Sequence, residues 1–276
     1  MVVVSAWPAD LAGERFGALV RDVRFVKRWL LLPRVASTND ELRRLAAAGA
    51  EEGTVVLADE QTAGRGRQGR SWHSTAGAGL YLSVLLRPSD PAPAVTRWTI
   101  AAALAAAEAC RATSGVDVAI EWPNDLMAGG RKVGGILAES RTTGSRVDEL
   151  ILGVGINVHH AAADFPPELR TSATSLSIAG DRRPDRGRLA AALLERIGAL
   201  AEDLARGGWP EIVAGWERLA PGARGSRVRV LPAGRDERAV EGVTCGLDAC
   251  GALRVLGGDG RMIVVRRLDS VAALGR

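Results

Sequence analysis

Apolar residues fall into short runs separated by polar and glycine-rich segments. Residues 55–58 and 80–86 are two strongly apolar runs, and each has the length of a buried strand. The segment 64–70 between them holds three glycines and three arginines, and Trp72 follows it. Glycine lets backbone N–H groups approach a ligand closely, and arginine offers a planar cation to carboxylate and phosphate oxygens. A basic loop between two core strands predicts an anion-binding site, although similar tracts occur in disordered RNA-binding segments.

The same patterns predict a mixture of helices and strands up to about residue 221. Thr38 and Glu41 have capping-box spacing, which predicts a helix that begins near residue 38 and ends at Gly49. Alternation of apolar and polar residues from Val116 to Trp122 predicts a half-buried strand. We also predict an alanine-rich helix at 94–112 and two strands, 132–139 and 149–158, joined by a turn at Thr143-Gly144. A long helix capped by Asp185 and a short helix at 210–219 follow.

The character of the chain changes after Pro221-Gly222. Four short apolar runs separated by glycine turns predict a small β-barrel, at 228–231, 239–243, 252–256 and 262–265. Residues 1–33 are too few for a core of their own or for a helix-turn-helix module with its supporting helices. We therefore predict an N-terminal lead-in packed on the main domain, the main domain itself and the barrel, at residues 1–33, 34–221 and 222–276.

Composition narrows the class of protein. The chain has 276 residues, 47% of them hydrophobic and 25% charged, which is typical of a globular protein. A net charge of +4 is too small to indicate a nucleic-acid-binding protein without a clustered patch. The cysteines Cys110, Cys245 and Cys250 disfavour a disulfide framework or a zinc site and fit a reducing compartment. We find no signal peptide and no membrane-spanning run, so we expect a cytoplasmic protein that binds neither membranes nor nucleic acid.

Five segments, read in order, resemble the successive motifs of biotin protein ligases. They are Ser37-Thr38-Asn39, the loop 64–70, Trp122-Pro123-Asn124-Asp125-Leu126, residues 131–137 and residues 153–158. Each motif is weak alone, but five in the right order are specific. The resemblance implies an α+β fold, with a mixed β-sheet catalytic domain flanked by helices, class II synthetase-like, and a small C-terminal SH3-like β-barrel. It makes 34–221 the biotin- and ATP-binding domain.

The resemblance also implies a reaction. Such ligases make biotinyl-5'-AMP from biotin and ATP, and then pass biotin to one lysine of a biotin carboxyl carrier domain. This chemistry needs cations, because a carboxylate approaches the α-phosphate while charge grows on the departing pyrophosphate. By resemblance the catalytic residues are Lys132, Arg67 and Asp125. The Mg²⁺ ion is held mainly by the ATP phosphates, with Asp125 as a further candidate ligand or as the base for the acceptor lysine.

The remaining site residues follow from the same resemblance. Short polar side chains and glycines surround the ureido ring and the tail of biotin, and basic and aromatic side chains take the adenylate. Biotin binding is assigned to Ser37, Thr38, Asn39, Gln61, Gly64, Arg65, Gly66, Arg67, Lys132, Gly134 and Gly155. ATP and adenylate binding is assigned to Arg65, Arg67, Arg70, Trp72, Asn124, Asp125, Lys132 and Asn157.

Plainer interpretations stay open for several of these residues. Strand alternation places Lys132 and Gly134 on one face, which leaves room for a ligand, but Lys132 also suits a surface position beside a turn. Gly153 and Gly155 share a bare face that fits either a flat ligand or a closely packed helix. Thr38 can act only as a helix cap, Gln61 as an ordinary loop residue, Asn124-Asp125 as a turn, and 64–70 as a solvated loop.

One residue departs from the family pattern. The family almost always has lysine immediately before Trp-Pro-Asn-Asp, whereas this chain has Glu121. Alternation along the strand predicts that Glu121 lies on the face opposite Trp122. A carboxylate there reverses the sign of the charge near the polyphosphate. We therefore expect weaker ATP binding or slower adenylation, unless Arg131 compensates.

Other functions stay open on the sequence. A lipoate–protein ligase shares the fold and the chemistry, although the loop 64–70 favours biotin. A non-repressing biotin-binding protein with impaired adenylation would need no turnover. A DNA-binding repressor is disfavoured because residues 1–33 are too short for its module, and Lys132 disfavours a purely RNA-binding protein. We expect a monomer or weak homodimer, and a loop at 64–72 that is mobile without ligand and closes over the adenylate.

Overall fold

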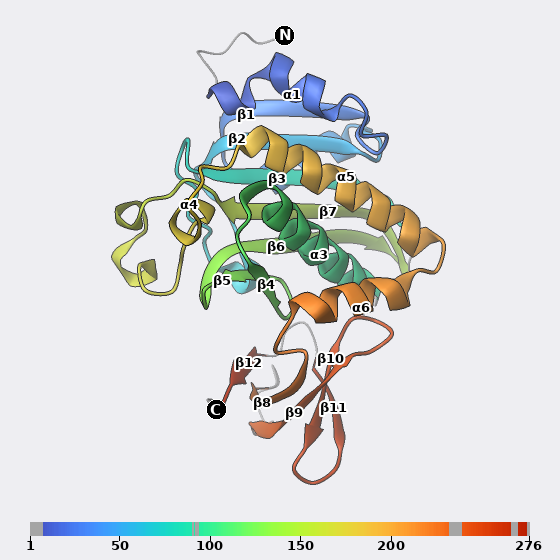
Figure 1. Ribbon diagram of the computed structural model, residues 1–276. Coiled ribbons are helices and arrows are strands. Elements are labelled where there is room, and N and C mark those ends of the chain that lie inside the picture. The colour runs from blue at the N-terminus through green and yellow to red at the C-terminus, as the bar shows by residue number, and fades with distance from the viewer. Residues whose placement is uncertain (1–7, 90, 92–93, 232–238, 266–269, 275–276) are drawn as a thin grey trace.

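The computed structural model describes every residue except 1–7, 90, 92–93, 232–238, 266–269 and 275–276. Its centre is a seven-stranded sheet in the order β1-β2-β3-β7-β6-β5-β4 (Figure 1). Strands β1 and β2 run parallel and the other neighbours run antiparallel, so the sheet is mixed, as predicted. The strands are β1 (Arg28–Val35), β2 (Thr54–Gln61), β3 (Gly79–Leu86), β4 (Val118–Glu121), β5 (Asp125–Ala128), β6 (Arg131–Thr143) and β7 (Arg146–Asn157).

Helices pack on both faces of this sheet (Figure 1). Two long helices cross one face, and α2 packs on β2, β3 and β7 of the other. Val55 and Leu57 join the core under the long helices, whereas Val56 packs with Leu42 of α2. The apolar run at 55–58 is therefore a strand buried on both faces. The helices are α1 (Gly13–Val20), α2 (Thr38–Ala47), α3 (Val95–Ser114), α4 (Leu176–Ala179), α5 (Arg186–Ala205) and α6 (Trp209–Leu219), with α3 and α5 the long pair.

The structure corrects three sequence-based expectations. Strands β1 and β5 were not predicted, and β5 begins at Asp125, for which a turn was one open interpretation. Strand β4 ends at Glu121, so Trp122 lies in the tight turn between β4 and β5 rather than in the strand. Ser37 is the N-cap of α2 and makes no side-chain capping bond, so the predicted capping by Thr38 is wrong. The predicted cap by Asp185 is confirmed, since its carboxylate accepts the N–H of Arg188 at 2.8 Å.

A buried ion cluster joins the N-terminal segment to the main sheet. The guanidinium of Arg186 on α5 is 1% exposed, and it donates hydrogen bonds to Asp10 at 2.8 Å and to Asp59 at 2.7 Å. Burial opposes ionisation of Asp10, but the nearby imidazole of His159 and the hydrogen bonds from Arg186 outweigh it and hold the pKa of Asp10 well below its usual range. Strand β1 runs across residue 33, at which we placed a domain boundary, and the predicted domain limits stay a prediction.

A second, antiparallel sheet follows α6 and lies below the main sheet in Figure 1. Within the described residues its order is β11-β10-β9-β8-β12. The indole N–H of Trp122 donates to the carbonyl of Gly251 at 3.2 Å and so links the β4–β5 turn to this sheet. The sheet matches the small C-terminal β-domain predicted from the sequence, with strands β8 (Arg224–Leu231), β9 (Val240–Leu247), β10 (Leu253–Gly257), β11 (Met262–Val265) and β12 (Ser270–Ala273).

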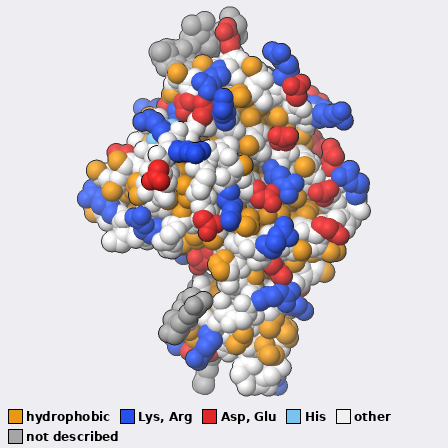
Figure 2. Space-filling model, viewed as in Figure 1, with side chains coloured by type: hydrophobic (Ala, Val, Ile, Leu, Met, Phe, Trp, Pro, Cys, Tyr) orange, Lys and Arg blue, Asp and Glu red, His pale blue; other side chains and the backbone are white. Residues whose placement is uncertain are grey.

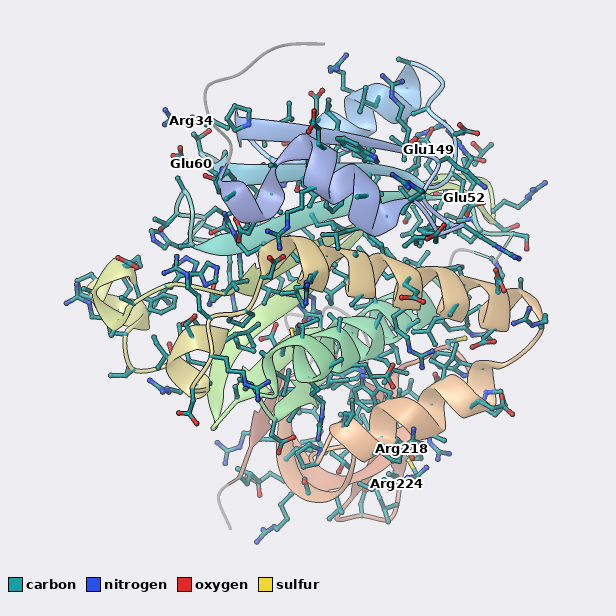
Figure 3. The ribbon with its side chains drawn as sticks, turned by 45° about the horizontal axis from the view of Figure 1, so that its top comes forward. Arg34, Glu52, Glu60, Glu149, Arg218 and Arg224 are labelled. Carbon is teal, nitrogen blue, oxygen red and sulfur yellow. The ribbon has the colours of Figure 1, made fainter. Side chains whose placement is uncertain are left out.

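Surface charges are mixed rather than separated by sign. On the face shown in Figure 2, acidic and basic side chains lie among one another. Arg34 and Glu60 lie together at one end of the parallel pair β1–β2 (Figure 3), with Nε 3.4 Å from Oε2, as their register requires. None of the helices in the described part of the chain combines the length and apolarity that a membrane crossing requires.

Candidate active site

A cavity of about 580 Å³ opens on the face of the sheet that carries α2. The start of α2, the loop after β2, the β4–β5 turn and strands β6 and β7 converge on it. The predicted site residues Gly64 and Gly134 lie behind its wall. The wall contains the other predicted residues, which are Ser37, Thr38, Asn39, Gln61, Arg65, Gly66, Arg67, Arg70, Trp72, Asn124, Asp125, Lys132, Gly155 and Asn157.

The arginine loop, residues 64–72, folds back on itself as a small hairpin. The N–H of Gly66 donates to the carbonyl of Arg70 at 2.7 Å, and the N–H of Trp72 donates to that of Gly64 at 2.8 Å. A Cβ on Gly64 would stand 2.6 Å from the Trp72 carbonyl oxygen, so only glycine fits there. Gly64 therefore allows the hairpin to close and does not face the cavity. Mobility of the loop without ligand stays a prediction.

Lys132 and Asp125 form the charged pair at the centre of the cavity wall. The Lys132 ammonium lies 2.7 Å from Asp125 Oδ1 and 5.7 Å from the centre of the Trp72 ring. The two residues begin neighbouring antiparallel strands, β6 and β5, and this pairing brings their side chains together. The Lys132 side chain is 36% exposed and lines the cavity, so it can meet a bound anion without leaving its partner.

A bulge decides which glycine faces this pair. The register between β5 and β6 shifts after Leu126, which pairs with Gly134, while Met127 pairs with Lys132. A Cβ on Gly134 would meet Leu126 in the core at 2.9 Å, whereas one on Gly135 would lie 3.5 Å from Lys132 Cε. The prediction that Gly134 shares a face with Lys132 is therefore wrong, and Gly135 takes that place.

Arg67 reaches across the cavity to the β4–β5 turn. Its Nη1 donates to Asn124 Oδ1 at 3.0 Å, and Asn124 Nδ2 donates to the carbonyl of Ile136 at 3.0 Å. Asn124 is thus fixed on β6 and holds the arginine in turn. Asn157, at the end of β7, donates to the carbonyl of Thr174 at 3.0 Å. Arg67 and Lys132 therefore present two cations to one cavity.

A buried polar network lies beneath the predicted biotin-binding residues. Gln61 Oε1 accepts from the N–H and the hydroxyl of Thr38, at 2.9 and 3.0 Å. Ser83 Oγ lies 2.7 Å from Thr38 Oγ1 and 2.6 Å from Asn39 Oδ1. The sequence analysis missed Ser83, although it is the one serine within the apolar run 80–86. A hydroxyl in a fully buried strand needs partners, and that was the available signal.

Gly153 and Gly155 leave one face of β7 without side chains, as predicted, and Asn39 and Trp72 fill part of that space. A Cβ on Gly153 would stand 2.4 Å from Asn39 Oδ1, and one on Gly155 would stand 2.7 Å from the Trp72 ring. Val154 and Ile156 point into the core beneath α3, as the alternation predicted. The two glycines therefore let Asn39 and Trp72 approach the sheet closely.

An aromatic pair that sequence reasoning missed closes the far end of the cavity. The ring of Phe165 lines the cavity and stacks on His160, with 5.0 Å between the ring centres. Burial, assisted by the nearby charge of His73, lowers the pKa of His160 to about 4. His160 is therefore neutral at physiological pH and acts as an apolar support for Phe165.

Glu121 lines the cavity together with Trp122, although strand alternation predicted that the two lie on opposite faces. It pairs in register with Asp125 across β4 and β5, and both Glu121 and Trp122 line the cavity. Burial, together with the charge of Asp125, raises the pKa of Glu121, and the charge of Lys132 opposes this rise. The nearby cation is therefore Lys132 rather than the expected Arg131.

Oxygen ligands suitable for Mg²⁺ are present at this wall. Asp125 and Glu121 pair across β4 and β5 and both line the cavity, and Mg²⁺ is usually held by one or two carboxylates together with substrate phosphates. Within the described residues no group of three His, Cys, Asp or Glu side chains could hold a metal by itself. Involvement of Mg²⁺ and of Asp125 as its ligand stays a prediction.

Comparisons with known proteins identify close similarities. The Biotin/lipoate A/B protein ligase family matches residues 31–157. The bifunctional ligase/repressor BirA of Bacillus spizizenii is 40% identical over 188 residues, which are 68% of this chain and 58% of the relative. The biotin–[acetyl-CoA-carboxylase] ligase of Mycobacterium tuberculosis is 38% identical over 247 residues, 87% of each chain. This chain thus spans 58% of the length of the first of these relatives.

Solved structures agree with this result. The biotin protein ligase of Aquifex aeolicus, in complex with biotin and ATP, superposes with a TM-score of 0.76 at 29% identity. The match covers 90% of this chain and 100% of that one. The Leishmania major biotin protein ligase in complex with biotinyl-5-AMP matches with a TM-score of 0.60 at 27% identity, over 87% of this chain and 99% of that one.

Proposed function

This chain belongs to the biotin/lipoate A/B protein ligase family, and from that premise we propose that it is an ATP-dependent biotin protein ligase. The observation that carries the proposal is the convergence of Lys132, paired with Asp125 at 2.7 Å, and Arg67 on one cavity of about 580 Å³. Two cations there suit a reaction that brings two anions together. Relatives with solved structures bind biotin with ATP, or biotinyl-5-AMP.

In the first step a carboxylate oxygen of biotin attacks the α-phosphorus of ATP. The bond from that phosphorus to the bridging oxygen breaks, and pyrophosphate leaves with the bond electrons. Lys132 and Arg67 stabilise the charge that develops on the phosphate oxygens, at positions that Asp125 and Asn124 already fix. Mg²⁺ carried by the phosphates would supply further charge neutralisation.

In the second step the deprotonated amine of an acceptor lysine attacks the acyl carbon of the adenylate. The acyl–oxygen bond breaks, AMP leaves, and an amide joins biotin to the acceptor. We propose Asp125 as the group that takes the amine proton, because its carboxylate lies on the cavity wall beside Lys132. We propose a biotin carboxyl carrier domain as the acceptor, in keeping with the name of the Mycobacterium tuberculosis relative.

Mass spectrometry of the products tests the proposal and its alternatives. The purified protein is incubated with ATP and Mg²⁺ and with either biotin or lipoate, without acceptor, and ATP is omitted in the control. We expect biotinyl-AMP and no lipoyl-AMP. Lipoyl-AMP alone would identify a lipoate ligase instead. Binding of biotin without either adenylate would indicate a binding protein and would contradict the proposal.

Glu121 should weaken ATP binding in this ligase. Replacing Glu121 by lysine is expected to lower the KM for ATP roughly three- to tenfold, because the change removes a negative charge beside Asp125 and adds a cation. Glu121→Gln, which only removes the charge, should move KM in the same direction by less. The measurement is the initial rate of adenylate formation over an ATP titration. Unchanged KM and turnover in both variants would show that this position is not coupled to the nucleotide.

A further inference from the structure

Two carboxylates hold the arginine loop against the main domain. Both terminal nitrogens of Arg65 bond to the carboxylate of Asp40 on α2, with Nη2 2.8 Å from Oδ1. Nη2 also lies 3.2 Å from Glu139 Oε2 on β6. The Arg65 side chain is 34% exposed, so this contact is partly withdrawn from water. The loop is therefore attached to two separate elements through one side chain.

The charges at this contact balance. Arg43 on α2 also pairs with the carboxylate of Asp40, and its Nη2 lies 3.0 Å from Glu139 Oε2. Two arginines thus face two carboxylates. The hydrogen bond from Arg65, opposed by burial and aided by Arg43, lowers the pKa of Asp40, so this carboxylate stays ionised at physiological pH. Arg65 therefore brings little net positive charge to the cavity.

Glu139 joins this contact to the floor of the predicted biotin subsite. Its Oε2 accepts a hydrogen bond from Asn39 Nδ2 at 2.6 Å. Asn39 Oδ1 in turn lies 2.6 Å from the buried hydroxyl of Ser83. The chain of contacts runs from β3 through α2 and β6 to the loop. A bond network of this kind transmits the position of one element to the next.

We propose that Asp40 and Glu139 are positioning residues that hold Arg65 as the anchor of the arginine loop. The anchor places Arg67, two residues further on, against Asn124 at the cavity. This inference rests on the proposed function and changes one assignment in it. Arg65 fixes the loop instead of binding the carboxylate of the substrate, and Arg67 and Lys132 bind the anions.

Limited proteolysis of the ligand-free protein tests the anchor without any assumption about activity. Trypsin cleaves after Arg65, Arg67 and Arg70 if the loop opens. In Asp40→Asn/Glu139→Gln we expect the initial rate of cleavage in the loop to rise about fivefold, since two partly exposed ion pairs are lost. Each single variant should lie between the parent and the double variant. The matched control is Glu41→Gln, which removes a carboxylate of α2 that pairs with Arg44 at 2.6 Å and does not touch the loop.

A rate of loop cleavage in the double variant equal to that of the parent would overturn the inference. The comparison is made at sites inside and outside the loop, and thermal melting checks that the variants are folded. Faster cleavage throughout the chain would indicate global destabilisation and would equally count against a specific anchor. Absence of any adenylate would refute the proposed function but would leave the proteolysis result valid.

The direction in which the KM for biotin changes shows whether Arg65 anchors the loop or binds the substrate carboxylate. If Asp40 and Glu139 position the loop, neutralising them raises the KM for biotin about fivefold and leaves kcat for adenylate formation within about twofold. If Arg65 instead binds the substrate carboxylate, removal of its competitors lowers the KM. A lower KM in the double variant, with Glu41→Gln unchanged, would therefore contradict the proposal.

Discussion

Lys132→Ala is expected to lower kcat for biotinyl-AMP formation by about 10²- to 10³-fold, with biotin affinity changed by less than about threefold. The ammonium is the cation that Asp125 holds at the cavity wall, and its loss removes a charge that acts on the reacting phosphate. By the resemblance, residues of α2 and β7 contact the ureido ring and the tail of biotin, so most of its binding should survive the loss of one contact to its carboxylate. The measurement is single-turnover adenylate formation at saturating ATP, with biotin binding followed by calorimetry.

The chain supplies a matched control and a sharper variant. Lys27 and Lys132 are its two lysines, and Lys27 is exposed and outside the cavity, so Lys27→Ala should retain full activity. Lys132→Arg keeps the charge, but a guanidinium is larger and flat and spreads its charge over three nitrogens instead of placing it at one ammonium. We expect Lys132→Arg to lose most of its activity. More than a tenth of the parent turnover in Lys132→Ala would contradict the assigned role.

Arg186→Met is expected to lower the free energy of unfolding by about 3 kcal/mol, the low end for breaking a buried ion cluster. The side chain is 1% exposed and neutralises two carboxylates, so its removal leaves Asp10 and Asp59 facing each other. The value is at the low end because both carboxylates keep some contact with water. Urea unfolding measures the change, and Arg188→Met on the exposed side of the same helix is the control. Equal unfolding midpoints for the two variants would exclude the cluster as a major source of stability.

The same cluster predicts the direction of pH dependence. In the folded protein the pKa of Asp10 lies well below its ordinary value near 3.9, which an unfolded chain would show. A depressed pKa stabilises the folded state at every pH above that ordinary value, and the contribution is lost as the pH falls below it. The parent should therefore lose stability on acidification below about pH 4, and Arg186→Met should lose less over the same range. Parallel acid unfolding curves for both proteins would refute this prediction.

Much of the main fold could be predicted because its elements depend on local patterns. The apolar run 55–58 has the length and composition of a strand that is buried on both faces. Gly49 and Asp185 mark helix ends, because glycine favours the backbone conformation after a helix and aspartate caps its first N–H groups. The site could be located because its five motifs occur along the chain in the same order as in the family that the chain resembles. Lys132, Arg67, Asn124 and Asp125 were placed together on this basis, and they do line one cavity.

The parts that failed depend on contacts between distant segments. A bulge between β5 and β6 exchanges Gly134 for Gly135, and strict alternation along one strand cannot reveal it. Glu121 enters the cavity because β4 ends there and pairs with β5, which was not predicted. The partners of Arg65, Asp40 and Glu139, lie 25 and 74 residues away from it in the chain. Each of these outcomes is set by the pairing of strands and helices rather than by neighbours in sequence.

For this protein, the sequence by itself determined where the longer helices and most strands lie, and that a basic loop and the motif residues line one cavity. These properties follow from side-chain type and from local periodicity, which need no partner to be recognised. The tertiary structure alone decided which group each cation of the site meets, because Coulomb and hydrogen-bond energies depend on the distance between groups and not on their order along the chain. Arg65 and Arg67 stand two residues apart, yet Arg65 pairs with Asp40 and Glu139 whereas Arg67 meets Asn124.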